Sequence, residues 1–234
     1  SSCGTPTTVG YSPAAEPRLP RNLEPAGLDD LVDGVHLQDV ELDGGVAVDL
    51  AVEDLRLTGC RLAGVRLPGA TLAGPEWADV VFEDCDLSGV TLKEAQLRRV
   101  VFRRCRLSAL VAAEVVASDL GMVDCKADEA WLRMARIERA DVSRCDLTGS
   151  DWYRAQVSHA RITGCRLEGA QWSQAKLDDV ALHGSSLGGV LGGDGLRNVV
   201  GGPEQVLDLA LVVLPSLGIR IEDPPDDEGG GAER

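Results

Sequence analysis

An apolar residue recurs at every fifth position of this chain, from Leu37 to Leu187, and the phase never slips. All 31 of these central positions hold Leu, Ala, Val, Trp, Phe, Ile or Met. A second column lies two residues earlier, from Val35 to Ser185, and holds Ala, Val, Leu or Cys at 27 of its 31 places. Neither column contains a charged residue, so two positions in every five are predicted to face a core.

A period of five fits neither a helix, which repeats every 3.6 residues, nor a strand, which repeats every two. A longer echo accompanies it, because VVFEDCDLSG at 80–89 returns as VVFRRCRLSA at 100–109. Four groups of five therefore close one coil, and residues twenty apart stack on each other. Five cysteines follow this spacing and are predicted to form one interior column: Cys85, Cys105, Cys125, Cys145 and Cys165.

The repeat resembles the pentapeptide-repeat family, whose consensus is roughly Ala-(Asp/Asn)-Leu-X-X. The closest matches are CDLSG at 85–89, CDLTG at 145–149 and CRLEG at 165–169, and the resemblance extends from residue 35 to about 190. It implies an all-β fold, a right-handed quadrilateral β-helix. With coils about 4.8 Å apart, nearly eight coils make a rod on the order of 37 Å long.

The ends of such a rod need covers, because a solenoid exposes strand edges and apolar surface there. We expect a disordered segment at 1–21, an amino-terminal cap at 22–34, and the β-helix at 35–190. A glycine-rich link and a carboxy-terminal helical cap are expected at 191–221, followed by a disordered acidic tail at 222–234. In the helical stretch, Pro203 suits a first turn, Pro215 a kink or an early end, and Gly218 the stop.

The predicted carboxy-terminal helix is apolar on more than one face, so burial on the last coil alone does not satisfy it. In family members that bind gyrase, such a segment mediates dimerisation, and the resemblance therefore implies a homodimer. A plain monomeric cap is the alternative. The candidate dimer-interface residues are Val206, Leu207, Ala210, Leu211, Val213 and Leu214.

The chain lacks a recognisable catalytic or metal-binding pattern. His36, His159 and His183 lie at outward positions on different coils and do not converge. Stacked cysteines cannot surround zinc tetrahedrally, and their parallel Cβ bonds disfavour disulfides. No phosphate-binding glycine loop is present. We expect no enzyme, no cofactor and no metal.

Charge restricts the partners. The formal net charge is -15, which argues against direct binding of nucleic acid or an anionic membrane. With no apolar window of 18 residues and no visible secretory signal, we expect a soluble, cytoplasmic protein. Outward columns alternate in sign from coil to coil, as in Asp79, Arg99, Asp119 and Arg139, and in Asp84, Arg104, Asp124 and Arg144. This alternation predicts ion pairs between neighbouring coils.

Some pentapeptide-repeat proteins resemble B-form DNA and bind bacterial DNA gyrase, protecting it from topoisomerase poisons. The resemblance therefore implies a non-catalytic binding protein that mimics DNA and modulates gyrase. Residues 35–86 have a net charge of -8, whereas residues 93–166 have +4, so the acid that could mimic DNA lies near the amino-terminal end. The chain also lacks the loop insertions of the plasmid-borne members. The candidate partner-binding acids are Asp39, Glu41, Asp43, Asp49, Glu53 and Asp54.

An exposed apolar belt supports a second hypothesis, an interaction scaffold for an unrelated protein. Val111, Val116, Trp131 and Met134 fall at outward positions on adjoining coils, with Val111 and Trp131 as direct stack neighbours, and Tyr153 lies one coil above Arg133. Clustered outward apolar residues mark contact sites more often than chance. Scattered surface exposure is the alternative reading of the same residues.

Overall fold

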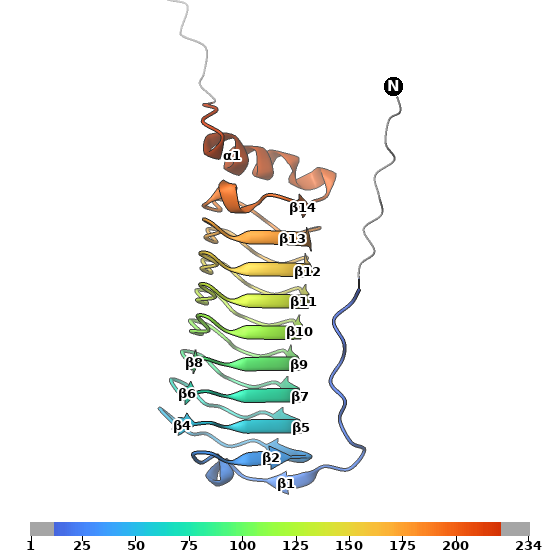
Figure 1. Cartoon of the computed structure of the whole chain (residues 1–234), viewed down its shortest axis with the longest axis vertical. Helices are drawn as coiled ribbons and strands as arrows, with labels where there is room; N and C mark the ends of the chain where they lie inside the picture. The colour runs from blue at the N-terminus through green and yellow to red at the C-terminus, as the bar shows by residue number, and fades with distance from the viewer. Residues whose placement is uncertain (1–11, 221–234) are drawn as a thin grey trace, which may run out of the picture.

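The computed structural model describes residues 12–220, and its centre is a four-walled parallel β-solenoid (Figure 1). One continuous parallel sheet runs in the order β1-β3-β5-β7-β9-β10-β11-β12-β13-β14, with β2 also pairing with β5. Its members are Glu24–Ala26 (β1), His36–Gln38 (β2), Val40–Asp43 (β3), Arg56–Ala63 (β5), Glu76–Glu83 (β7), Gln96–Arg103 (β9), Val116–Val123 (β10), Arg136–Ser143 (β11), Gln156–Thr163 (β12), Lys176–Ala181 (β13) and Val199–Val200 (β14).

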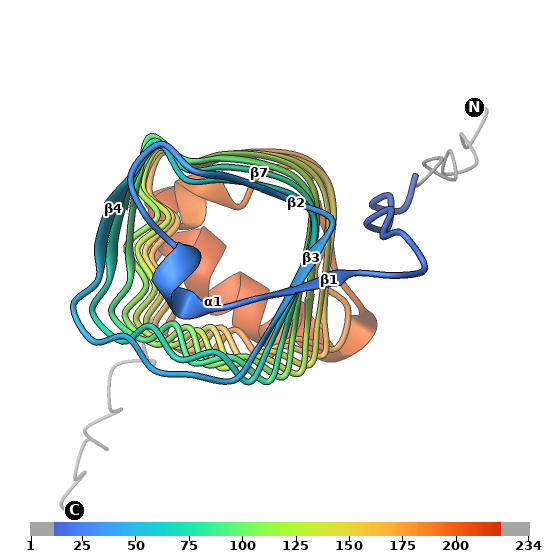
Figure 2. The same ribbon diagram turned by 90° about the horizontal axis from the view of Figure 1, so that it is seen from below.

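A shorter sheet forms another wall, with the order β4-β6-β8. Its strands are Ala51–Glu53 (β4), Thr71–Ala73 (β6) and Thr91–Lys93 (β8). Isolated parallel bridges, such as Thr91 with Val111 and Val111 with Trp131, continue this wall toward the carboxy terminus. Viewed along the rod, the coils superpose into a square outline (Figure 2). The right-handed quadrilateral β-helix predicted from the repeat is confirmed.

The register between coils follows the predicted twenty-residue spacing. Glu76 pairs with Gln96, and Gln96 pairs with Val116. The first and last turns depart from it, because Glu24 pairs with Val40 and Val180 pairs with Val199, offsets of 16 and 19 residues. The coil spacing is therefore regular only between the two ends of the rod.

The two apolar columns fill the interior. From Val52 onward every central residue is buried except Met122 and Leu132, which are half-buried. The five stacked cysteines are buried and free, and the backbone N–H of Cys105 points to the sulfur of Cys125 at 3.4 Å. Aromatic residues also stack along the interior, with the rings of Trp152 and Trp172 4.7 Å apart.

Each corner of the tube uses a left-handed backbone conformation, which the sequence reasoning linked only to glycine. The second residue after every central position, from Asp39 to Gly189, has a positive φ. Eleven of these 31 residues are glycines, and twenty carry side chains, including Met134 at φ +57°. A non-glycine residue in this region costs roughly 1–2 kcal/mol, so the stacked coils must hold these corners in place.

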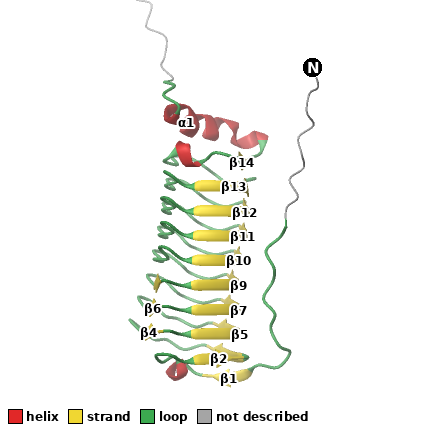
Figure 3. Ribbon diagram, viewed as in Figure 1, coloured by secondary structure: helices red, strands yellow, loops and turns green. Residues whose placement is uncertain are grey.

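The carboxy-terminal cap consists of two 3₁₀ turns, Gly193–Gly195 (η2) and Pro203–Gln205 (η3), and one α-helix, Val206–Ser216 (α1), which crosses the end of the tube (Figure 3). Pro215 lies inside α1, one residue before its end. Gly218, at φ +75°, donates its N–H to Pro215, and Ile219 donates to Leu214, which is a Schellman stop. At the opposite end, β1 and a 3₁₀ turn at Leu28–Asp30 (η1) lie below the first coil.

The expectation that residues 1–21 are disordered is wrong for residues 12–21, called the arm from here on. The arm runs beside the rod, parallel to its axis (Figure 1). The N–H of Arg18 donates to Asp79 at 2.9 Å, and that of Ala15 to Asp119 at 3.0 Å. These rod carboxylates satisfy the backbone of an extended chain. The predicted acidic tail, residues 222–234, lies outside the described residues.

Candidate binding surfaces

The six acids proposed from the sequence lie on the first coils and form what we call the acidic end: Asp39, Glu41, Asp43, Asp49, Glu53 and Asp54. Only Glu41 is neutralised, by an ion pair with Arg61. Within residues 12–220, the other five make no ion pair. Asp43, Asp49, Glu53 and Asp54 are exposed, and Asp39 is half-buried. The acidic end therefore carries uncompensated negative charge.

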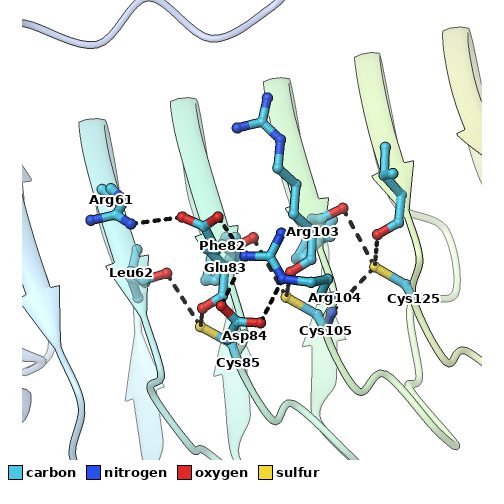
Figure 4. Close-up of polar contacts among 12 residues, drawn as sticks. Arg61, Leu62, Phe82, Glu83, Asp84, Cys85, Arg103, Arg104, Cys105 and Cys125 are labelled. Atoms are coloured by element: carbon cyan, nitrogen blue, oxygen red, sulfur yellow. Dashed lines mark hydrogen bonds and ion pairs between the residues drawn. The ribbon is translucent and has the colours of Figure 1, made fainter.

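The next coils are different, because arginines bridge the carboxylates of successive coils (Figure 4). Arg61 reaches from Glu41 to Glu83, and Arg104 reaches Glu83 at 2.6 Å and Asp84 at 2.8 Å. The hydrogen bond from Arg61, followed by that from Arg104, lowers the pKa of Glu83 below its ordinary value. Much of the negative charge is thus balanced locally.

The alternating columns predicted from the sequence form bidentate Arg–Asp pairs. In the open column, Arg104 binds Asp84 and Arg144 binds Asp124 at 2.7–2.9 Å. In the covered column, Arg99 binds Asp79 at 2.5 Å and Arg139 binds Asp119 at 2.7 and 3.0 Å. Of these two columns of ion pairs, the arm lies beside only the one called the covered column. There the aspartate side chains are 12% and 9% exposed, against 56% and 44% in the open column.

The structure divides the predicted apolar belt. Trp131 is 52% exposed and stacks on Val111, as expected, on the wall that contains β4, β6 and β8. Val116 and Met134 lie around the corner, where both line one depression together with Arg136, Arg154, Gln156 and Lys176. Tyr153 is half-buried and lies between two guanidinium groups, with Arg133 and Arg154 at 4.9 and 5.1 Å from its ring centre.

The proposed dimer-interface residues of α1 differ in exposure. Val206, Leu207 and Leu211 are 64%, 70% and 55% exposed. Ala210, Val213 and Leu214 are half-buried, and α1 contributes Leu209 and Val212 to the contact with the core. One side of α1 thus covers the last coil, while the other presents apolar side chains to solvent.

The three histidines lie on the outside of the rod. His36 contacts Thr58 at 3.1 Å, and His159 contacts Asp179 at 3.1 Å. Over residues 12–220, no group of three His, Cys, Asp or Glu side chains has an arrangement that could hold a metal ion. Burial raises the pKa of the Cys60 thiol. In the same part of the chain, no helix is long and apolar enough to cross a membrane.

The sequence reasoning missed one surface feature. Val81 and Val101 occupy outward positions one coil apart but are only 5% and 4% exposed, and the arm, which donates to Asp79, Asp119 and Asp141, runs along this column. Gly121 follows in the same column and is also buried. These three successive non-polar residues in one outward column could have indicated, from the sequence alone, that another segment covers them.

Comparison with known proteins agrees with the repeat geometry. The model of the pentapeptide repeat region matches residues 95–172, and the model of pentapeptide repeats in eight copies matches 66–104 and 155–191. No curated protein matches the chain.

Among solved structures, full-length QnrB1, a plasmid-mediated fluoroquinolone resistance protein, is 21% identical, with a TM-score of 0.40 over 75% of this chain and 100% of its own. HetL, a pentapeptide-repeat protein involved in heterocyst differentiation regulation in the cyanobacterium Nostoc sp. strain PCC 7120, is 18% identical, with a TM-score of 0.29 over 72% and 87% of the two chains. The family models together span residues 66–191, more than half of the chain, and the coils have the matching geometry, so the chain belongs to the pentapeptide-repeat family.

Proposed function

We propose that this protein is a non-catalytic binding protein that modulates DNA gyrase by presenting a DNA-like negative surface. The observation that carries the proposal is the acidic end, where five of six candidate carboxylates have no cationic partner among the described residues. Gyrase binds a polyanion, and a protein that offers fixed carboxylates on a rod competes for the same cationic surface. Family membership supports this choice of partner, because some pentapeptide-repeat proteins bind gyrase.

The distribution of charge limits where the contact would form. The Arg–Asp pairs of the middle coils balance each other, so they offer a cationic partner little net attraction. The acidic end lacks such pairs, and the contact is therefore assigned to the first coils rather than to the whole rod. Association would weaken with salt, because exposed charges are screened beyond about 8 Å at physiological ionic strength.

A homodimer through α1 is part of the proposal. Exposed Val206, Leu207 and Leu211 form an apolar surface on the cap, and a second copy would bury it. Two rods joined at their capped ends would place one acidic end at each extremity. Light scattering should then give twice the 24.7 kDa chain mass, and Leu207→Glu with Leu211→Glu should return it to 24.7 kDa. A monomer at high concentration would refute the dimer.

The gyrase proposal is tested by a supercoiling assay with gyrase, with and without a quinolone, titrated with the protein. A variant with Asp43→Asn, Asp49→Asn, Glu53→Gln and Asp54→Asn should lose its effect on gyrase while remaining folded. Asn tolerates the left-handed corners at positions 49 and 54.

The matched control removes the same charge elsewhere, with Glu94→Gln, Glu114→Gln, Glu129→Gln and Asp178→Asn. These four residues are exposed and lie outside the acidic end. The control should behave as the unmodified protein does. No inhibition or protection at micromolar protein would remove the gyrase proposal.

A second candidate function is a scaffold for an unrelated protein partner. It is favoured by one observation, the depression in which exposed Val116 and Met134 lie beside Arg136 and Lys176. Val116→Thr with Met134→Asn, both in this depression, should abolish co-purification of such a partner without unfolding the rod. An unchanged set of co-purified proteins would rule out this surface.

A further inference from the structure

The arm occupies a defined seat on the rod. Its floor is the part of one outward column formed by Val81, Val101 and Gly121, and Asp141 is the next residue of that column. The covered column, with Asp79 and Asp119, borders one side of the floor, and Arg103 lies on the other side. Gly121 is suited to the floor because an added Cβ would lie 2.8 Å from the Cγ2 of Val101.

The arm is bound mainly through its backbone. Arg18 donates its N–H to Asp79, Ala15 to Asp119 and Ala14 to Asp141, at 2.9, 3.0 and 3.0 Å. In a polyproline II-like chain, which has three residues per turn, N–H groups three residues apart point the same way and adjacent ones do not. This explains how Ala14 and Ala15 donate to different columns. One side-chain contact is added, an ion pair between Glu16 and Arg103 at 3.2 Å.

The spacing of the seat matches an extended peptide. Asp79 and Asp119 are two coils apart, about 9.6 Å at the usual strand separation of about 4.8 Å. Arg18 and Ala15 are three residues apart, about 9–10 Å at the rise of an extended or polyproline chain. The length of two coils of the rod therefore equals the length of three residues of peptide. For this reason Asp119 and Asp79 accept N–H groups that are three residues apart in the arm.

The seat combines an apolar floor with fixed carboxylates, a combination that an ordinary solvent-exposed surface does not require. Val81 and Val101 would be apolar and solvent-facing without the arm, and the covered aspartates are held in bidentate pairs by Arg99 and Arg139. The arm itself is held lightly. None of its residues is buried, and only Ala14, Pro17 and Leu19 are half-buried. A preformed seat with a lightly held occupant permits exchange.

We propose that this seat is a binding site for an extended, proline-containing peptide segment of a partner protein, and that the arm is its tethered occupant. The site selects chain conformation through carboxylates that accept N–H groups three residues apart. It selects side chains through the apolar floor, which fits small apolar residues, and through Arg103, which fits an acidic residue. The arm sequence SPAAEPRLPR at 12–21 has both properties and defines the class of ligand. The site is separate from the acidic end and does not depend on gyrase binding.

The test frees the seat in the full-length protein and adds the ligand in trans. Ala15→Pro with Arg18→Pro removes two donors from the tethered arm and leaves the rod unchanged, while proline remains compatible with an extended chain. The probe is a fluorescent synthetic peptide of residues 12–21, with binding followed by anisotropy. We expect saturable binding to this variant, and binding at least tenfold weaker to the unmodified protein, whose own arm competes.

Two controls separate specific seating from adhesion. A peptide N-methylated at the positions of Ala15 and Arg18 should bind at least tenfold more weakly, whereas N-methylation at Glu16 and Leu19, whose N–H groups make no bond to the rod, should matter little. Asp79→Asn with Asp119→Asn in the freed protein should weaken binding. The same change at Asp84 and Asp124 of the open column should not.

Three results would overturn the proposal. One is no binding to the freed protein at millimolar peptide. Another is equal affinity of the freed protein for both N-methylated peptides, a comparison in which the protein stays the same and only the peptide changes. The third is unchanged hydrogen exchange across residues 12–21 in the Ala15→Pro, Arg18→Pro protein, because the hydrogen bonds would then not hold the arm.

Discussion

The covered and open columns of the rod have the same residue types in the same geometry but different surroundings. Asp79–Arg99 and Asp119–Arg139 lie beneath the arm, whereas Asp84–Arg104 and Asp124–Arg144 face solvent. All eight residues occupy left-handed corners, and all four pairs are bidentate. Arg104 and Arg139 each contact one further carboxylate, Glu83 and Glu138, so Asp79–Arg99 and Asp124–Arg144 give the cleanest comparison of a covered pair with an exposed one.

Because water is excluded from the covered pairs, losing one partner there should destabilise the protein more than losing one partner of an open pair. A charge without water and without its partner is costly, whereas an exposed charge recovers its hydration. The covered aspartates also accept backbone N–H groups from the arm. We therefore infer that the same Arg–Asp pair supports the arm in one column and contributes mainly solubility in the other.

The largest expected effect is the loss of a covered arginine. Arg99→Ala leaves the Asp79 carboxylate beneath the arm without its cation and should lower the free energy of unfolding by about 2 kcal/mol. Arg144→Ala in the open column, where the arginine binds Asp124 alone, should have a smaller effect. Urea unfolding followed by circular dichroism compares the two variants, and equal losses would show that the arm does not change the environment of the pair.

The next effect concerns the floor beneath the arm. Gly121→Val places a side chain against Val101 and into the path of the arm, and should cost about 1–2 kcal/mol through overpacking. Hydrogen exchange at residues 12–21 should accelerate in the same variant. Ala181→Val is the matched control, because Ala181 lies in the same outward column three coils further on. Unchanged exchange in Gly121→Val would contradict the seat described for the arm.

A smaller effect should separate covered from exposed apolar residues. Val101→Thr puts a hydroxyl under the arm, where no partner awaits it, and should cost about 1 kcal/mol. Trp131→Gln changes a larger side chain at an exposed position and should leave the urea midpoint nearly unchanged. If both variants lose equal stability, Trp131 is supported by contacts that the structure does not show.

The smallest effect should appear only in acid. The hydrogen bond from Arg99 holds the pKa of Asp79 below its ordinary value, and that from Arg139 does the same for Asp119. A depressed folded pKa gives stability that is complete above the unfolded pKa of about 3.9 and is lost as pH falls through the folded value. The arm should therefore stay bound at pH 5 and detach only below about pH 4.

Carboxyl carbon NMR titration of Asp79, recorded with the signal of the Arg18 amide that donates to it, measures this detachment. Both signals should change together in the unmodified protein. In Arg99→Ala the transition should move to higher pH. Detachment at an unchanged pH in this variant would show that another group controls the arm.

The repeat was predictable from sequence because it depends on a simple physical rule. Every inward position must be apolar, and 31 successive central residues obey it, so the coil length, the cysteine column and the pairs between coils could be predicted before any coordinates. The corner conformation could not. Arg139 and Met134 do not favour positive φ, and only the stacking of coils above and below imposes it.

The arm could not be predicted from its own composition. Residues 12–21 have no periodicity, and their order comes from contacts with residues 61 to 127 positions away. The signal for it lies in the sequence of the rod, where Val81, Val101 and Gly121 interrupt a polar column. The exposed apolar side of α1 differs, because its pattern was readable from the sequence, and no contact within the described chain covers Val206, Leu207 and Leu211.

The twenty-residue register has a consequence for how this molecule can change in length. Deleting twenty residues would remove one coil, shorten the rod by about 4.8 Å and leave every remaining side chain on its own wall. Deleting five would rotate all later residues by a quarter turn, so that a cation would face a different direction from the acid below it. The length of such a rod therefore changes only by whole coils of twenty residues. A segment that lies along the rod, such as the arm, must change its own length by a matching amount.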